Sequence, residues 1–297
     1  MSLSAVLTAR VTAATYTLVD PTSTGTWNNT VGYGIWLADN DPATALPGTS
    51  DDVLVRDGET VLFGILTTNV NSINVSAGGT FNITSGNRAG IVNGLTNSGL
   101  VQYVGYVPGV ADGMSNRNLA VSSGNTQPFT FTNSGTFAVT AGEMMLSATI
   151  ANTGGLVRVD SGATLDLRGA TGITGGAFEV SAATKIYATN VGGVVLLANV
   201  VTDNAGYWEW FSNGMNDRAR TLTVSGGVFS NSGTFILRQD TSAMNFTRSL
   251  LDLNVNNSGT FVNNGVLTIE NTAAGSSAGS PNGNIEAQLT VENTAAE

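Results

Sequence analysis

The chain has 297 residues, of which 41% are hydrophobic and 11% are charged, and it contains 37 glycines but no cysteine and no histidine. The missing residue types exclude disulfides, metal sites built on cysteine or histidine, thiolate nucleophiles and Ser-His-Asp catalysis. The formal net charge of −10 and the 11 dispersed basic residues argue against a nucleic-acid partner, which needs a basic footprint.

The N-terminal residues 1–17 contain only short apolar pieces, which are interrupted by serine, threonine and Arg10. A secretory signal needs basic residues followed by a longer apolar stretch. No apolar run in the chain approaches the roughly 20 residues that cross a bilayer. We therefore expect a protein that is neither exported through a signal peptide nor inserted into a membrane.

Apolar residues recur at fixed distances from a glycine. They stand five and three positions before and after Gly58, and again around Gly78 and Gly162. Looser copies surround Gly124, Gly142 (where the pattern places Met145 inward) and Ala183. The interval from Gly58 to Gly78 equals the interval from Gly142 to Gly162. Alternation by two, a bend and renewed alternation at this period predict an all-β solenoid with about 20 residues per rung.

The pentapeptide NSGTF occurs three times, at Asn133–Phe137, Asn231–Phe235 and Asn257–Phe261. Asparagine tolerates left-handed turns and glycine bends easily, so we expect a corner followed by a strand whose phenylalanine points inward. Stacked asparagine or Ser/Thr corners are also able to form hydrogen-bonded ladders. The predicted structural turns are Gly58, Gly78, Gly135, Gly142, Gly162, Gly233 and Gly259.

Two segments interrupt this pattern, residues 86–128 and the aromatic, mixed-charge residues 190–220, and residues 275–284 are typical of a flexible linker. The predicted organisation is an N-terminal capping or attachment segment over residues 1–50, a β-solenoid over 51–274, and a linker with a short C-terminal strand over 275–297.

The N-terminal part resembles a known group of proteins. Trp27, Trp36, the PGTSDDV segment of residues 47–53 and the GGTF segment of residues 78–81 are similar to the opening of right-handed parallel β-helix proteins of bacterial and phage surfaces, which are adhesin-like or tailspike-like. The likeness is close as far as about Ser85 and loose beyond it. It implies a right-handed parallel β-helix and, in phage members, three-fold association. Such folds serve adhesins, tailspikes, capsid-surface proteins and polysaccharide lyases, so the fold does not decide the function.

Four acidic residues near the start, Asp39, Asp41, Asp51 and Asp52, have two interpretations. They either bind calcium through several oxygen ligands or stand as solvated carboxylates in a capping loop. Their spacing fits no EF-hand, and we therefore predict the capping loop and no metal or cofactor.

An aromatic and acidic stretch is the main candidate site. Its residues are Tyr207, Trp208, Glu209, Trp210, Phe211, Asp217 and Arg218. The favoured interpretation is a subunit contact or local core, because tryptophan, tyrosine and arginine are enriched at interfaces. The alternatives are a glycan-binding surface and a glycosidase that uses paired carboxylates from Asp203, Glu209 and Asp217.

These observations predict a non-enzymatic structural protein of a virion surface, such as a capsid decoration or tail-associated protein, acting in assembly, stabilisation or host-surface adhesion. Its expected partners are two further copies of itself, as the resemblance implies, and other virion or surface proteins, with a glycan as a possible ligand. One alternative is an extracellular adhesin or filament subunit of a bacterial surface. The other is a polysaccharide-degrading tailspike.

Overall fold

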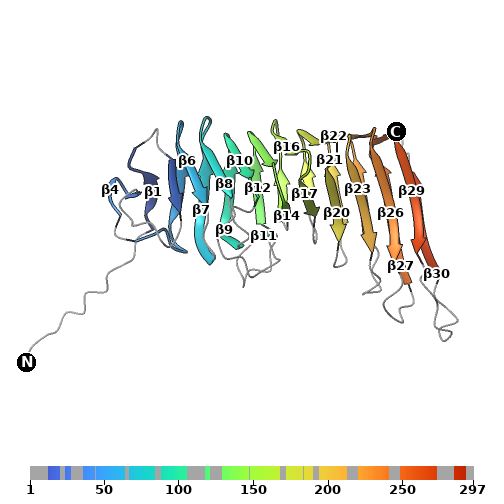
Figure 1. Ribbon diagram of the computed structural model, residues 1–297, viewed down its shortest axis with the longest axis horizontal. Coiled ribbons are helices and arrows are strands. Elements are labelled where there is room, and N and C mark those ends of the chain that lie inside the picture. The colour runs from blue at the N-terminus through green and yellow to red at the C-terminus, as the bar shows by residue number, and fades with distance from the viewer. Residues whose placement is uncertain are drawn as a thin grey trace, which may run out of the picture.

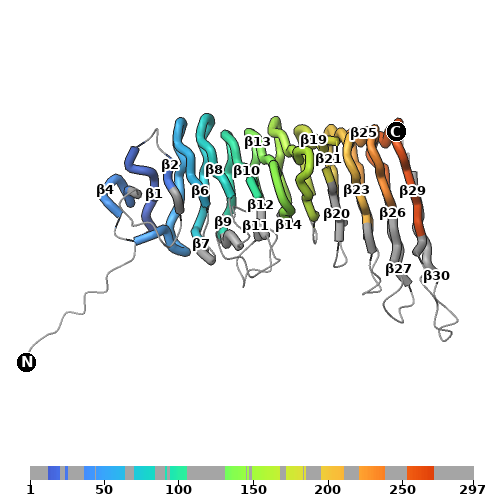
Figure 2. The backbone as a smooth tube through the Cα atoms, viewed as in Figure 1, coloured from blue at the N-terminus to red at the C-terminus, as the bar shows by residue number. Residues whose placement is uncertain are grey.

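The structure, a computed structural model, is built of β-strands that lie side by side along one long axis, in chain order (Figures 1 and 2). It describes residues 13–20, 24–27, 36–43, 45–63, 67–83, 88–105, 118–120, 129–146, 148–167, 172–182, 184–189, 194–212, 220–240, 248–272 and 284–291. Within these ranges there is no helix. The protein is therefore all-β, as its composition predicts.

The strands pair in parallel, and from β12 onward each strand pairs with the one three places further along the chain. Strand β13 (Thr136–Val139), for example, pairs with β16 (Leu156–Val159), which pairs with β19 (Ala177–Val180). Each repeat of the chain thus adds one strand to a ten-stranded sheet and two strands to a twenty-stranded sheet. Long parallel sheets of this kind are consistent with a β-solenoid.

The ten-stranded sheet takes the first strand of every repeat. Its strands are β2 (Thr24–Trp27), β6 (Thr60–Phe63), β8 (Thr80–Ile83), β10 (Leu100–Tyr103), β13, β16, β19, β22 (Val201–Asn204), β25 (Val228–Asn231) and β28 (Thr260–Asn263).

The twenty-stranded sheet contains two runs of paired strands. Run A consists of β11 (Asn118–Ala120), β14 (Glu143–Leu146), β17 (Thr164–Leu167), β20 (Lys185–Thr189), β23 (Tyr207–Ser212), β26 (Thr234–Asp240) and β29 (Val266–Thr272). Run B consists of β1 (Thr15–Leu18), β5 (Asp52–Val55), β12 (Phe129–Asn133), β15 (Ala148–Ala151), β18 (Gly172–Thr174), β21 (Val194–Ala198), β24 (Arg220–Ser225), β27 (Arg248–Asn256) and β30 (Asn284–Val291). The long strands β7 (Thr67–Val75) and β9 (Arg88–Asn97) link the runs, since β9 pairs with both β11 and β12.

From β12 onward each repeat, as far as its residues are described, has two tight corners. At the first corner the chain passes from run B into the ten-stranded sheet, and at the second corner it passes from that sheet into run A. The core lies between the sheets and receives alternate side chains of each strand, as around Gly58, where Val53, Val55, Val61 and Phe63 are all buried. The alternation predicted around Gly78 and Gly162 is confirmed in the same way.

The inward position predicted at Met145 is wrong by one residue. Met144 and Leu146 are the buried side chains of β14. Val139 pairs with Val159 before the second corner, and Glu143 pairs with Thr164 after it. The corner between β13 and β14 is therefore one residue shorter than the corner between β16 and β17. The inward positions after the corner therefore shift by one.

The three NSGTF copies occupy two different corners. Asn133–Phe137 forms a first corner between β12 and β13, whereas Asn231–Phe235 forms a second corner between β25 and β26. In the third copy β27 ends one residue earlier, at Asn256, and Asn257 and Ser258 adopt positive φ angles of 48° and 63°. Phe137 and Phe235 are fully buried as predicted, and Phe261 is partly buried.

Glycine serves two different purposes at these corners. Gly162 has a φ of 80° with nothing within 4 Å of an added Cβ, so it supplies the left-handed conformation that the sequence predicts. Gly135 has no such φ, and a Cβ there would lie 2.2 Å from the carbonyl oxygen of Gly99 in the preceding repeat. Glycine is needed at residue 135 because successive corners stack closely there, not because the backbone has an unusual φ.

The repeat length is not constant. Thr136 pairs with Leu156, whereas Val228 pairs with Thr260, so the later repeat contains more residues than the earlier one. The strands of runs A and B lengthen as well, from four residues in β14 and β15 to seven in β26 and nine in β27. The predicted period holds from Thr60 to Leu100 and from Thr136 to Ala177. Between them Leu100 pairs with Thr136, so this longer repeat spans most of the interruption predicted at 86–128. The interruption predicted at 190–220 includes regular strands (β21, β22 and β23).

The N-terminal end differs from the rest because it contains antiparallel strands. Strand β1 pairs in parallel with β5 and antiparallel with β3 (Trp36–Ala38), which in turn pairs antiparallel with β4 (Asp41–Pro42). Because β1 and β2 also pair directly with β5 and β6, the boundary near residue 50 remains a prediction.

Candidate functional site

The aromatic stretch predicted as a site forms strand β23 in the middle of run A. It lies between β20 and β26, with Trp208 in register with Phe235 and Glu209 in register with Ile236. The alternation of the strand turns Trp208 and Trp210 inward, where they are 0% and 3% exposed. The stretch is therefore part of a regular sheet rather than a protruding loop.

Trp208 is the centre of an aromatic cluster in the core. Its ring centroid lies 5.5 Å from that of Phe178, 5.1 Å from that of Phe229 and 6.2 Å from that of Phe235. Edge-to-face and tilted ring pairs of this kind stabilise a core beyond the burial of their area. Both tryptophans are thus placed as local core, and neither presents a ring to a ligand at the surface.

Glu209 lies on the opposite side of β23, facing away from the core, yet it is only 6% exposed. The Tyr207 hydroxyl donates a hydrogen bond of 2.8 Å to its Oε2. Asp166 on β17 is also buried, and it stands in the same row because Asp166 pairs with Tyr187 and Tyr187 pairs with Glu209. Two inter-strand spacings of about 4.8 Å each separate the backbone of Asp166 from that of Glu209.

Asp203 does not join this pair. It belongs to β22 in the ten-stranded sheet, where it is exposed and in register with Glu179. The second corner at residues 204–206 separates it from Glu209, so the two carboxylates lie on different sheets. Asp217 and Arg218 lie outside the described residues, as does the side chain of Phe211.

Two of the four acidic residues near the N-terminus, Asp39 and Asp51, hold the start of the cap strand β1. Asp51 accepts hydrogen bonds from the backbone N–H groups of Ala14 (3.1 Å) and Gly48 (2.8 Å), and Asp39 accepts one from Thr15 (2.8 Å). Burial raises the pKa of Tyr16 on β1, and the charges of Asp51 and Asp39 raise it further. Among the described residues no group of three or more acidic side chains is arranged to hold a metal ion.

A partly buried ion pair fixes the same end of the molecule. Glu59 is fully buried and contacts Arg56 at 2.6 Å, while Arg56 also donates a hydrogen bond to the carbonyl of Leu18 at the end of β1. Because the guanidinium bridges the first corner at residues 56–59 and the cap strand, it ties β1 to the repeat that follows. Sequence reasoning overlooked Glu59, since nothing in the DGET segment marks it as buried.

Two asparagine ladders run along the corners. At first corners, the side-chain amide of Asn97 donates to Oδ1 of Asn133 (2.7 Å), and Asn133 donates to Asn152 (2.6 Å). At second corners, Asn204 donates to Asn231 (2.8 Å) and Asn231 donates to Asn263 (2.6 Å). All of these asparagines except Asn263 are buried. The predicted ladders are confirmed, and the repeated asparagines have a structural role.

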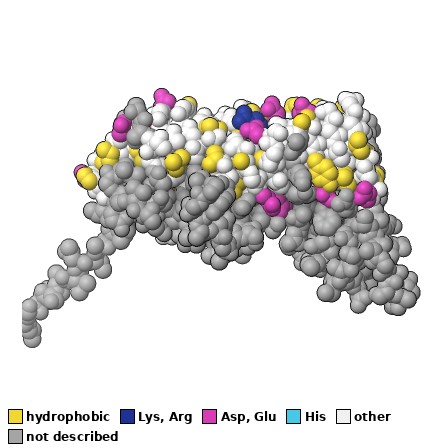
Figure 3. All heavy atoms as spheres, viewed as in Figure 1, with side chains coloured by type: hydrophobic (Ala, Val, Ile, Leu, Met, Phe, Trp, Pro, Cys, Tyr) yellow, Lys and Arg dark blue, Asp and Glu magenta, His cyan; other side chains and the backbone are white. Residues whose placement is uncertain are grey.

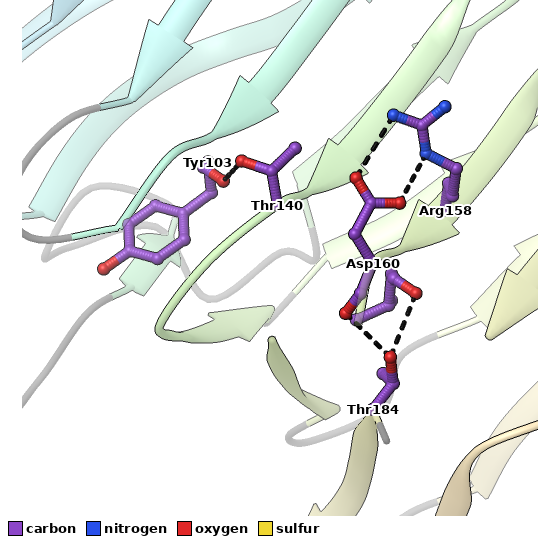
Figure 4. A network of polar contacts seen from close by, with 6 residues as sticks. Tyr103, Thr140, Arg158, Asp160 and Thr184 are labelled. Atoms are coloured by element: carbon purple, nitrogen blue, oxygen red, sulfur yellow. Dashed lines mark hydrogen bonds and ion pairs between the residues drawn. The ribbon is translucent and has the colours of Figure 1, made fainter. Parts of the chain in front are cut away.

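Hydroxyl groups reinforce other second corners (Figure 4). The Thr140 hydroxyl donates to the carbonyl of Tyr103 in the preceding repeat (2.9 Å), and the Thr184 hydroxyl donates to the carbonyl of Asp160 (2.7 Å). The side chain of Asp160 forms an ion pair with Arg158 at 2.7 Å on the surface. An exposed pair of this kind contributes little to stability, so the hydroxyl bonds are the more important contacts.

The visible surface carries few charges. Figure 3 shows isolated acidic side chains and small apolar spots scattered over a mostly uncharged face, without a basic patch among the coloured residues. Within the described ranges there is also no helix long and apolar enough to cross a membrane. Comparison with protein-family models, curated proteins and solved structures finds no match to this chain.

Proposed function

We propose that this chain is a right-handed β-solenoid that serves as a non-enzymatic structural protein of a virion surface, as a capsid decoration or tail-associated protein. The parallel, in-register pairing of each strand with the strand three places on supports the solenoid. The placement of the distinctive residues supports the structural role. Trp208, Trp210 and the ladder asparagines are all committed to packing or to hydrogen bonds between repeats.

The two asparagine ladders carry the proposal. A buried side-chain amide is stable when its donors and acceptors are paired. Asn133, Asn152 and Asn231 each pair with both the repeat before and the repeat after, while Asn97 and Asn204 at the start of the ladders donate to the repeat after. The buried Oδ1 of Asn204 has no hydrogen-bond partner among the described residues. Such stacking makes each repeat depend on its neighbours and produces a stiff rod. A stiff, sparsely charged rod suits a part that must keep its shape on the outside of a particle.

The location is tested by surface labelling. An antibody raised against the purified chain should decorate intact virions, seen by immunogold electron microscopy, under conditions that leave the particles closed. Label on bacterial cells and their filaments instead would establish the alternative of an adhesin or filament subunit. Label found only after the particles or cells are broken open would contradict both.

The polysaccharide-degrading alternative depends on Asp166 and Glu209, the two buried carboxylates in one outward row of run A. We expect no release of reducing ends from a panel of bacterial surface polysaccharides. Should cleavage occur, Asp166→Asn and Glu209→Gln would show whether this row is responsible. Loss of cleavage in both variants, with the fold retained by circular dichroism, would overturn the non-enzymatic role.

A further inference from the structure

The C-terminal end of the stack is formed by β28, β29 and β30, and the first two of these strands expose positions that are buried one repeat earlier. Ile269 is 45% exposed, whereas Leu237, with which it pairs, is fully buried. Phe261 is partly exposed, whereas Phe229, with which it pairs, is fully buried. The cross-section of the core is therefore open at Phe261 and Ile269, and no described strand pairs with the outer edges of β28, β29 or β30.

The second-corner ladder is also incomplete at this end. Asn204 and Asn231 each donate both to the next asparagine and to a backbone carbonyl of the next repeat, Thr234 and Val266 respectively. Asn263 is exposed, and its amide donates to the carbonyl of Gly265 within its own corner at 3.2 Å. The donor that earlier ladder members direct to a following repeat is thus presented at the surface.

The strand edges at this end are not protected in the usual way. Exposed edge strands normally carry charges, prolines or bulges that prevent pairing with another chain. β28 contains no charged residue, β29 contains one (Glu270) and β30 contains one (Glu286), and none of the three contains proline. At the opposite end, by contrast, the outer edge of β1 is covered by the antiparallel strands β3 and β4.

We propose that a second copy of this chain binds to this end, C-terminal end against C-terminal end. A two-fold contact of this kind pairs the open edges of both copies with each other, so the assembly is closed. Both N-terminal ends, where β3 and β4 cover β1, remain outside the contact. The contact packs the exposed core residues of the two copies against each other. An asparagine side chain is both donor and acceptor, so Asn263 of each copy completes the ladder of the other. The inference rests on the proposed structural function and names a partner for it.

The test is the solution mass of the full chain by light scattering over a range of concentrations. The wild type should have twice the mass of the 30.4 kDa chain, or six times if a three-fold association through the sides also forms. Ile269→Lys places a charge in the open core cross-section, and Asn263→Asp replaces the donor amide by a carboxylate that repels its counterpart. Both variants should halve the mass. Val201→Lys is the control, because Val201 is 59% exposed on the ten-stranded sheet, away from this end.

A wild-type mass of one or three chains at every concentration would overturn the inference. So would a mass that stays unchanged in Asn263→Asp, the variant expected to fold even if Ile269→Lys does not, with circular dichroism as the check. If Val201→Lys alone halves the mass, the contact lies on the side of the stack, and this result would also overturn the inference. A monomer would leave the proposed function untouched, because surface labelling tests that function independently.

Discussion

At the scale of single residues, this protein uses polar side chains as internal structure. The ladder residue Asn133 illustrates this, because it is 1% exposed, accepts from Asn97 and donates to Asn152. In an ordinary domain a buried asparagine is an expensive exception. Here the stacking of repeats supplies the partners that make it favourable.

Asn133→Ala should therefore be strongly destabilising. It leaves the amide of Asn97 without one acceptor and Oδ1 of Asn152 without its donor, at a cost of about 1–3 kcal/mol for each buried group left unpaired. The free energy of unfolding is measured by urea denaturation. Asn264→Ala is the matched control, since Asn264 is exposed at the last second corner, and an equal loss in both variants would contradict the ladder's importance.

Because of Tyr16, we expect the stability of the N-terminal cap to fall at alkaline pH. Its pKa is raised above 10.0 in the folded state by burial, with Asp51 and Asp39 adding to the effect, so folding favours the protonated phenol. This contribution to stability is complete below pH 10 and is lost as the pH rises through the raised pKa. Tyr16→Phe should flatten the fall in unfolding free energy above pH 10. An unchanged alkaline slope would show that Tyr16 does not control it.

At the scale of elements, the corners decide how closely the strands stack. Gly135 and Gly162 both look like turn glycines in the sequence, but only Gly162 has a positive φ. At Gly135 the limit is the carbonyl of Gly99 in the preceding repeat, 2.2 Å from where a Cβ would lie. A steric conflict between backbones of neighbouring repeats cannot be relieved by rotating a side chain.

Gly135→Ala should accordingly cost more stability than Gly162→Ala. The second variant only forces alanine into a left-handed conformation, which costs roughly 1–2 kcal/mol. The first must separate two stacked corners and should weaken the ladder contact between Asn97 and Asn133 beside them. Comparison of the urea midpoints of the two variants measures the difference, and equal midpoints would show that the stack has room at residue 135.

At the scale of the whole molecule, the two ends of the stack are unequal. The N-terminal end has antiparallel cover and the Arg56–Glu59 ion pair, whereas the C-terminal end exposes the core at Phe261 and Ile269. In repeat architectures stability is close to a sum over neighbouring repeats. The repeat with a neighbour on one side only should open first.

Hydrogen exchange measured by mass spectrometry should reveal this asymmetry. Amides of β28 should exchange earlier than those of β16, which has paired strands on both sides. Dilution below the concentration at which the proposed dimer forms should increase the difference, and Asn263→Asp should remove its concentration dependence. Uniform exchange along the stack would contradict the unequal ends.

Much of the fold could be predicted from the sequence because it depends on local pattern. Alternation by two around Gly58 and Gly162 defined inward side chains correctly, and the repeated asparagines predicted ladders. The inward position at Met144 instead of Met145 was not predictable. A corner that is one residue shorter turns each side chain of the following strand to the other face, and it leaves no mark in the composition.

The candidate site was less accessible to sequence reasoning. Residues 207–211 are aromatic except for Glu209, so apolar and polar positions do not alternate clearly there. The sequence therefore left local core, subunit contact and ligand site open. The pairing of β23 with β20 and β26 resolved this for Trp208 and Trp210 by turning them into the core. The burial of Glu209 on the outward side is also a property of the fold, since it depends on chain segments that are distant in sequence.

The sequence by itself determined that this chain forms many short strands around a shared apolar core, because strand alternation and turn residues act over a few positions. Only the tertiary structure decided which corner each NSGTF copy forms, which asparagines belong to the same ladder and which end of the stack is left open. These properties depend on the register between strands of successive repeats, whose spacing along the chain varies, and identical pentapeptides carry no information about that register.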